Sequence, residues 1–225
     1  MGSVKRQSIV HSARSHSQLL QLLGGSGGYI GIGALAYSPD GKHLLSGDSD
    51  GFGIIWDPAT GKKLLTIPPS NKEGLSGDAY IPEAIGDAAY SPDGKHLALA
   101  GEQGSTRILD AASKKELLDL RGHTGAVGIV TFSPDGKLVA TASFDRTVRL
   151  WDSTTGVNLL TLPLFGGISF SPDGKRLAVG TESGVYVFVL PIDELVALAK
   201  QRVTRSLTPE ECQQYLHVEA CPAQP

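Results

Sequence analysis

The chain has 225 residues, of which 40% are hydrophobic and 19% charged, and its formal net charge is −3. This composition is typical of a folded soluble domain and offers no basic surface for nucleic acid. The sequence has two cysteines and no apolar run of ~20 residues, which argues against a disulfide-stapled scaffold and against a membrane-spanning helix.

The N-terminal segment 1–17 is predicted to be flexible. It contains Lys5, Arg6 and Arg14, but no apolar stretch follows, so a secretory signal peptide is not expected. The next stretch, Ser17–Leu23, reads SQLLQLL and has the apolar pattern that also ends the later repeats. It predicts a lone outer strand at the start of a repeat-containing domain over residues 18–190.

Four copies of one motif organise this domain. An aromatic residue precedes Ser-Pro-Asp-Gly-Lys at Tyr37, Tyr90, Phe132 and Phe170, with spacings of 53, 42 and 38 residues. Proline fixes the backbone at the second position of a turn, serine and aspartate bond to nearby amides, and glycine accepts a positive φ. Alternating apolar residues flank the copies, so the motif predicts four strand–turn–strand units rather than a repeated chemical site.

The connection between the first two repeats is longer than the others. It has 23 residues from Ile67 to Tyr90, against 12 from Leu120 to Phe132, so about 11 residues are inserted. Two interpretations remain open, a tolerated long loop or a loop that binds a protein partner. The candidate contact residues of the second interpretation are Asp78, Tyr80, Ile81, Pro82 and Glu83.

The third repeat is the most complete. Trp151-Asp152 follows Phe132 at the same spacing as Trp56-Asp57 follows Tyr37, and Gly-His precedes the repeat at His123. A period of about 40–45 residues with Trp-Asp pairs is the sequence sign of propeller blades. The chain resembles the WD40-repeat family over residues 18–190. The four strands predicted for the third repeat are Ala126–Ser133, Leu138–Ser143, Thr147–Asp152 and Val157–Leu162.

The resemblance implies a buried hydrogen-bonded network. In that family the histidine of a Gly-His pair, a second-strand Ser or Thr, a turn Asp and the Trp indole are linked, and buried imidazole and indole groups need such partners. Their expected role here is structural, and the second and fourth repeats are expected to rely on packing alone. The residues that match are His123, Thr141, Asp145 and Trp151 in the third repeat, and Ser46, Asp50 and Trp56 in the first, which has no histidine.

The expected fold is an all-β, WD40-type β-propeller with four blades and a short α-helical C-terminal tail. Rings of this family usually have more blades. Three arrangements remain open: a closed small ring, an open partial propeller left from a longer protein, or two chains that pair into one larger ring. The resemblance also implies that the N-terminal strand completes the last blade, which has three strands of its own and ends at Val185–Leu190.

The tail, residues 191–225, has a different pattern. IDELVALAKQRV carries apolar residues at helical spacing, and a capping pattern starts at Thr208, so two short helices are predicted. This tail resembles the C-terminal extension of bacterial multidomain WD40 proteins that carry a STAND-type NTPase or an activator domain upstream. Cys212 and Cys221 remain open as free thiols, a disulfide or, with His217, a zinc site, although no metal is expected.

Two short motifs are similar to catalytic patterns but lie on predicted strands or strand turns. Gly47–Gly51 reads G-x-S-x-G, which requires a strand-to-helix elbow, and Gly31–Ala36 reads G-x-G-x-x-A, which requires a helix to follow. The predicted first strands have almost no metal ligands, which disfavours a propeller hydrolase or lactonase. We therefore expect no catalytic residues and no cofactor.

The expected function is that of a non-catalytic protein–protein interaction scaffold or sensor module in the cytoplasm. Its partners are expected to be proteins, and neither nucleic acid nor a membrane. The alternative is an assembly fragment that completes a larger propeller by pairing with another chain, including a homodimer through open propeller ends.

Overall fold

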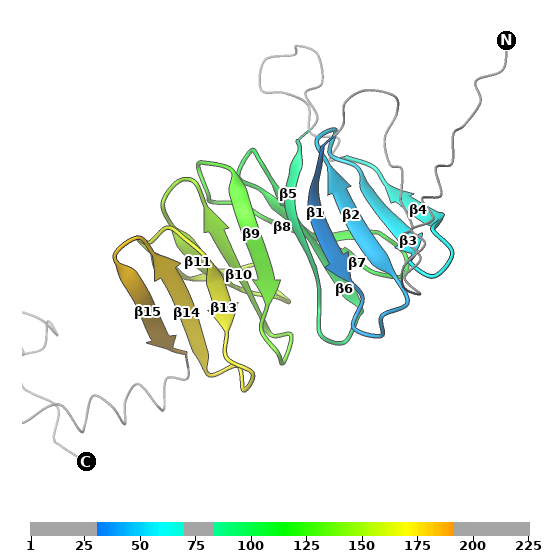
Figure 1. Ribbon diagram of the computed structural model, residues 1–225. Helices are drawn as coiled ribbons and strands as arrows, with labels where there is room; N and C mark the ends of the chain where they lie inside the picture. Colours follow the sequence, from blue (N-terminus) through cyan, green and yellow to red (C-terminus); the bar gives the residue numbers. More distant parts are fainter. Residues whose placement is uncertain (1–30, 70–82, 191–225) are drawn as a thin grey trace, which may run out of the picture. The chain divides into compact units, whose positions relative to one another are not determined.

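The structure is a computed structural model that describes residues 31–69 and 83–190. Every helix or strand in these ranges is a β-strand, and the strands form four antiparallel sheets (Figure 1). This confirms the predicted all-β, propeller-type fold with four repeats. The chain divides into two units, Met1–Val187 and Phe188–Pro225. The sheets belong to the first unit, apart from the last residues of β15.

The first two sheets each have four strands in chain order. The first sheet consists of β1 (Ile32–Tyr37), β2 (Leu44–Asp48), β3 (Gly53–Asp57) and β4 (Lys62–Ile67). The second sheet consists of β5 (Ile85–Tyr90), β6 (His96–Gly101), β7 (Thr106–Asp110) and β8 (Glu116–Leu120).

The third sheet also has four strands, and the fourth has three. The strands predicted for the third repeat agree with the observed ones to within one residue at each end. The predicted strand Ser17–Leu23 and the helices of the tail lie outside the described residues. The strands are β9 (Val127–Phe132), β10 (Leu138–Ser143), β11 (Val148–Asp152) and β12 (Asn158–Leu162), then β13 (Ile168–Phe170), β14 (Arg176–Thr181) and β15 (Gly184–Val189).

The Ser-Pro-Asp-Gly-Lys motif forms the turn between the first two strands of each sheet. In the first sheet the Ser38 hydroxyl donates to Asp40 Oδ1 at 2.6 Å, and the amide of Lys42 donates to the same oxygen at 3.1 Å. Gly41 has a φ of 69°, which favours glycine. The same serine–aspartate bond recurs in the other three sheets. The motif is therefore a structural turn, as the sequence predicts.

Neighbouring sheets pack face to face through apolar side chains. The core between the first and second sheets consists of Ala34, Leu45, Ile55, Ile67, Ile85, Ala88, Leu97, Leu99 and Leu109. The core between the second and third sheets consists of Ala98, Ala100, Ile108, Leu120, Val127, Val130, Phe132, Val139 and Trp151. Each four-stranded sheet can bury both faces in this way, which is how stacked repeats gain their stability.

The first strands of neighbouring sheets lie side by side, β1 next to β5 and β5 next to β9 (Figure 1). A Cβ atom at Gly33 would lie 2.6 Å from the carbonyl oxygen of Ile85, so glycine permits this close approach. The Asp87 carboxylate on β5 accepts a hydrogen bond from the Val130 amide on β9 at 2.9 Å. Burial raises the pKa of Asp87, against the hydrogen bonds from Val130 and Ala88.

Candidate interaction sites

The structure brings the four predicted network residues of the third sheet together. His123 Nδ1 lies 2.9 Å from Asp145 Oδ2, and His123 Nε2 lies 2.8 Å from Thr141 Oγ1. The Trp151 indole N–H donates to Thr141 Oγ1 at 2.8 Å. His123 precedes β9, Thr141 is on β10, Asp145 is in the β10–β11 turn and Trp151 is on β11, so one chain of bonds crosses the sheet.

A neutral imidazole satisfies this chain of bonds. Because Thr141 Oγ1 accepts from Trp151, its hydroxyl proton can donate to His123 Nε2, which leaves Nδ1–H to donate to Asp145. Burial lowers the pKa of His123, although Asp145 acts in the opposite direction. Burial alone would raise the pKa of Asp145, but hydrogen bonds from Thr147, His123 and Thr124 hold it well below its usual range.

The histidine–aspartate pair does not form a catalytic site. The side chain of His123 is 1% exposed and that of Asp145 is 6% exposed, so a substrate does not reach the imidazole. Both ring nitrogens already face protein partners. The arrangement orders the turn and the loop before β9.

The first sheet keeps part of the network. The Trp56 indole donates to Ser46 Oγ at 2.8 Å. The turn between β2 and β3 is capped by Asp48, whose Oδ1 accepts from the amides of Asp50 and Phe52 at 3.1 and 2.8 Å. Burial raises the pKa of Asp48 despite these bonds. Sequence reasoning named Asp50 and missed Asp48.

The position of Asp48 within its repeat predicts that it caps the turn. Asp48 follows the motif aromatic Tyr37 at the same spacing as Ser143 follows Phe132. Ser143 Oγ accepts from the amide of Asp145 at 3.0 Å, which is the same capping of the equivalent turn. An alignment of the repeats at this position predicts a polar cap in both turns.

The second sheet closes its equivalent turn with Glu83, which lies in the loop before β5. Glu83 Oε1 accepts from the amides of Gln103 and Ser105 at 3.0 and 3.4 Å, and Oε2 accepts from the Ser105 hydroxyl at 2.8 Å. A Cβ atom at Gly101 would collide with this carboxylate, so glycine makes room for it. The expectation that the second repeat relies on packing alone is therefore wrong, because a loop carboxylate replaces the missing network.

This finding gives Glu83 a structural role, because its carboxylate accepts hydrogen bonds from the β6–β7 turn. Its predicted role in a partner-binding loop stays a prediction. The other predicted contact residues of the inserted loop, Asp78, Tyr80, Ile81 and Pro82, lie outside the described residues.

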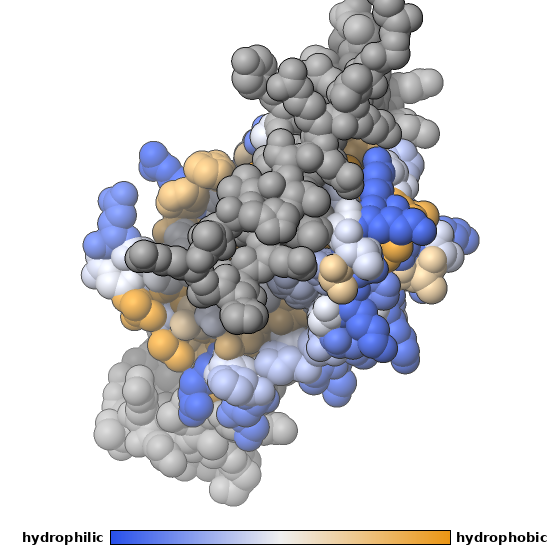
Figure 2. Space-filling view, turned by 45° about the vertical axis from the view of Figure 1, so that its right-hand side comes forward, coloured by the Kyte–Doolittle hydropathy of each residue, from blue (hydrophilic) through white to orange (hydrophobic). Residues whose placement is uncertain are grey.

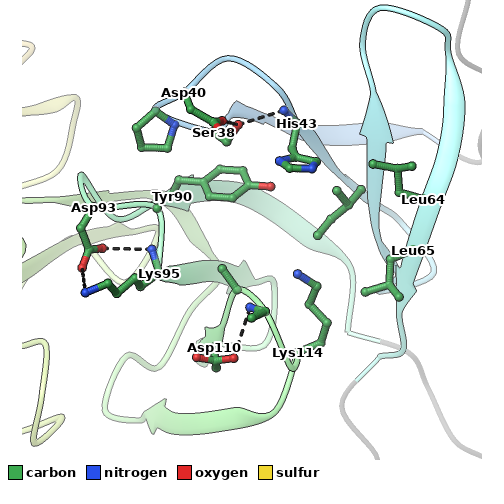
Figure 3. Close-up of a pocket in the computed structure, with 15 residues that line it drawn as sticks. Ser38, Asp40, His43, Leu64, Leu65, Tyr90, Asp93, Lys95, Asp110 and Lys114 are labelled. Carbon is green, nitrogen blue, oxygen red and sulfur yellow. Dashed lines mark hydrogen bonds and ion pairs between the residues drawn. The ribbon is translucent and has the colours of Figure 1, made fainter.

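A groove of about 660 Å³ lies between the first two sheets, next to the Ser-Pro-Asp-Gly turns (Figure 3). Ile55, Leu64 and Leu65 form an apolar wall on the side of the first sheet. The ring of Tyr90 lies across the groove, between the turn that holds Asp40 and the side chain of Lys114. The groove thus combines an apolar wall with a phenol and an ammonium group.

Burial shapes the charges of this groove. It raises the pKa of Tyr90 to about 12, with a further contribution from Asp40, so the phenol stays neutral. Burial also lowers the pKa of Lys114, against the attraction of Asp110. The groove can hold a peptide segment, but a similar groove of about 730 Å³ recurs between the second and third sheets. Its recurrence indicates that stacked repeats produce it, whatever the function.

An exposed aromatic pair lies beside the fourth sheet. Phe144, in the β10–β11 turn, is 67% exposed, and Phe165, before β13, is 45% exposed. Their ring centroids lie 5.4 Å apart. They line a hollow of about 820 Å³ together with Arg146 and Glu182.

Phe144 departs from the pattern of the repeats. When the repeats are aligned on the motif aromatic, the residues at the position of Phe144 are Ser49, Glu102 and Glu182. An aromatic side chain in a turn where the other repeats have polar ones is not required by the fold. Sequence reasoning missed it, although the alignment of the four repeats contains the signal.

The two catalytic-like motifs have structural explanations. Gly33 allows the close approach of β1 and β5, and a Cβ atom at Gly47 would collide with the side chain of Ile85. Gly51 has a φ of 78°, which completes the turn around Ser49. Within residues 31–69 and 83–190, no group of His, Cys, Asp or Glu is placed to hold a metal ion, and no helix could span a membrane.

Comparisons with known proteins agree with this repeat structure. Residues 17–57 and 114–152 match the family model described as WD domain, G-beta repeat. Both stretches are therefore similar to WD40 repeats. They include Ser46, Asp50 and Trp56 of the first repeat, and His123, Thr141, Asp145 and Trp151 of the third, so the network residues lie within the matched ranges.

Similar proteins include two named small ribosomal subunit proteins. The chain is 33% identical to the small ribosomal subunit protein RACK1z of Oryza sativa subsp. japonica over 99 residues, which cover 44% of this chain and 25% of that protein. It is 33% identical to the RACK1 protein of Brassica napus over 107 residues, 48% of this chain and 28% of that protein. It is 31% identical to human transducin beta-like protein 3 over 86 residues, 38% of this chain and 10% of that protein.

These matches span a quarter or slightly more of the RACK1 proteins and a tenth of transducin beta-like protein 3. The similarity therefore concerns the WD40 repeats and not the relatives as whole proteins. The three relatives come from plants and human, and the predicted bacterial multidomain context stays a prediction.

Proposed function

We propose that this WD40-repeat chain is a non-catalytic protein-interaction scaffold. Hydrogen bonds within the repeats fix their turns, through the His123–Asp145 chain in the third sheet and the Glu83 carboxylate in the second. A scaffold of this kind holds its surface turns in fixed positions, and side chains on such turns can contact a partner. Hydrophobic residues also reach the described surface in several places among hydrophilic ones (Figure 2).

The exposed Phe144 is the observation that carries this proposal. Aromatic side chains are enriched among the residues that contribute most to protein–protein binding, because they bury a large area with few rotatable bonds. Phe144 pairs with Phe165 at the surface, and Arg146 follows in the same turn. We therefore place the centre of the partner-binding surface at the Phe144–Phe165 pair rather than at Glu83.

Affinity capture with the purified chain tests this proposal. The chain is compared with a Phe144→Ser variant, which carries the residue of the first repeat, and with a Leu159→Ser control, since Leu159 is 53% exposed on β12. The expected result is that at least one protein retained from a lysate of the source organism by the wild type and the control is lost with Phe144→Ser. Identical protein sets for all three chains would contradict the proposal. Circular dichroism checks that each variant is folded.

A sensor role in the cytoplasm is part of the same proposal. We infer a cytoplasmic sensor module that works beside an NTPase or activator domain, on the basis of the repeat pattern and the tail from residue 191. The coding sequence around this chain is the direct test, because an adjacent NTPase or activator domain is expected there. A neighbourhood without such a domain would leave the scaffold function standing and remove the sensor role.

A further inference from the structure

The first sheet presents an apolar face that has no sheet packed against it among the described residues. On β1, Ile32 is 44% exposed, Leu35 is 63% exposed and Tyr37 is 62% exposed. Three large apolar side chains on one strand are an unusual surface for a folded protein. Such a group indicates a surface that another structure covers.

The equivalent positions in the second and third sheets indicate what kind of structure covers this face. Tyr37 is the aromatic residue of the first motif, Leu35 lies two residues before it and Ile32 lies five residues before it. In the next two sheets, the residues at these positions pack against the preceding sheet. These residues are Ile85, Ala88 and Tyr90 in the second sheet, and Val127, Val130 and Phe132 in the third.

The fourth sheet carries the other half of the same interface. Ala178 and Gly180 on β14 occupy the positions of Ala98 and Ala100 on β6, which pack against the third sheet. Ala178 and Gly180 are only partly buried. The fourth sheet thus offers small side chains where the other sheets receive their neighbour.

A contact at Gly47 shows which residues of the first and fourth sheets would meet. Gly47 is the equivalent of Gly180, and the side chain of Ile85 packs so closely against Gly47 that a Cβ atom there would collide with it. Ile32 is the equivalent of Ile85. Among residues 31–69 and 83–190, a Cβ atom at Gly180 would find only the carbonyl oxygen of Gly167, at 3.8 Å, so no described side chain fills the space that would receive Ile32.

We propose that a second copy of this chain docks its fourth sheet on the first sheet of its neighbour. The interface repeats the packing that the chain makes between its first and second sheets, with Ile32 seated at Gly180 of the other copy. Because the two surfaces differ, the contact is head to tail. This proposal goes beyond the scaffold function and does not depend on Phe144.

Light scattering coupled to size-exclusion chromatography tests the association on the full chain, whose monomer mass is 23.6 kDa. The wild type is expected at two copies or more. The variants Leu35→Lys and Ala178→Lys, one on each face, are each expected at the monomer mass. Leu159→Lys, on the exposed side of β12, serves as the matched control and is expected to associate like the wild type.

Mixing the two monomeric variants gives the decisive result. Each variant keeps one intact face, so a head-to-tail interface predicts that the mixture forms a one-to-one dimer and nothing larger. The dimer also shows that both variants are folded. A wild type that stays monomeric up to roughly 100 μM would overturn the proposal, since the face would then be covered by residues 1–30 or by another protein. Association that survives both substitutions would overturn it as well.

Discussion

The second and third sheets each use a carboxylate to cap the turn between their second and third strands. The two carboxylates come from different segments of the chain. In the third sheet, Asp145 lies in the turn and accepts from the amide of Thr124 in the preceding loop at 3.0 Å. In the second sheet, Glu83 lies in the loop and accepts from the amides of Gln103 and Ser105 in the turn. Both solutions join the loop to the turn through one acidic side chain.

The difference follows from what lies beneath the turn. The third sheet buries Thr141 and Trp151, whose polar atoms need a chain of partners that ends at Asp145. The second sheet has Leu99 and Leu109 at these two positions, and both are buried in an apolar core. Its carboxylate therefore has only the turn to satisfy. The hydrogen-bonded chain can therefore be absent from a sheet when both buried positions, those of Thr141 and Trp151, carry apolar residues together.

Removal of the third-sheet carboxylate is expected to have the largest effect. Asp145→Ala should lower the free energy of unfolding by about 3 kcal/mol, because it leaves the buried His123 and the amides of Thr124 and Thr147 without their acceptor. Glu83→Ala should cost only about 1 kcal/mol, since water can reach the turn amides of the second sheet. Urea unfolding followed by circular dichroism measures both. Equal losses would show that the two carboxylates are equivalent.

Filling the space beside Glu83 in the second sheet is expected to have the next largest effect on the free energy of unfolding. Gly101→Ala should cost about 2 kcal/mol, because its Cβ atom would collide with the carboxylate. In a Glu83→Ala background the same substitution should cost less than about 1 kcal/mol, since the colliding group is gone. A double-mutant cycle in urea gives the coupling between the two residues. Additive losses would contradict this account of Gly101.

The sequence predicts the repeated elements of this fold well. The strands of the third repeat agree within one residue because the Ser-Pro-Asp-Gly turn and the alternating apolar residues are local signals. The bonds from Trp151 to Thr141 and from Trp56 to Ser46 lie between residues at fixed spacing, which the resemblance to WD40 repeats brings into register. Local pattern and register are sufficient for these features.

The parts that were missed depend on contacts between loops. Glu83 caps a turn that is distant in the sequence, and no spacing rule says which residue of a variable loop faces that turn. Phe144 and Asp48 are different, because a comparison of the four repeats with one another reveals both positions. The inner contact at Gly33 requires the distance between two sheets, which a single strand pattern does not contain.

Protonation of His123 in the third sheet is expected to produce a smaller effect. The folded-state pKa of His123 lies below its unfolded value of about 6.5, so the unfolded chain binds the proton more readily. The stabilisation by neutral His123 is therefore present above about pH 6.5 and is lost as the pH falls from there toward the lower folded-state pKa. The free energy of unfolding is therefore expected to fall between pH 7 and pH 5. Unfolding of a His123→Phe variant should depend less steeply on pH in this window, and an unchanged slope would contradict the assignment.

The smallest expected effect is that of Glu83→Gln, and it sharpens the comparison. The amide oxygen of glutamine can still accept from Gln103 and Ser105, and its NH₂ group can donate to the Ser105 hydroxyl, so a loss below about 0.5 kcal/mol is expected. Asp145→Asn has no such solution, because each oxygen of Asp145 accepts from a backbone amide, that of Thr124 on one and that of Thr147 on the other. Its loss should approach that of Asp145→Ala. Urea unfolding of the two amide variants side by side tests this, and a large loss for Glu83→Gln would mean that the second sheet, too, requires a charge.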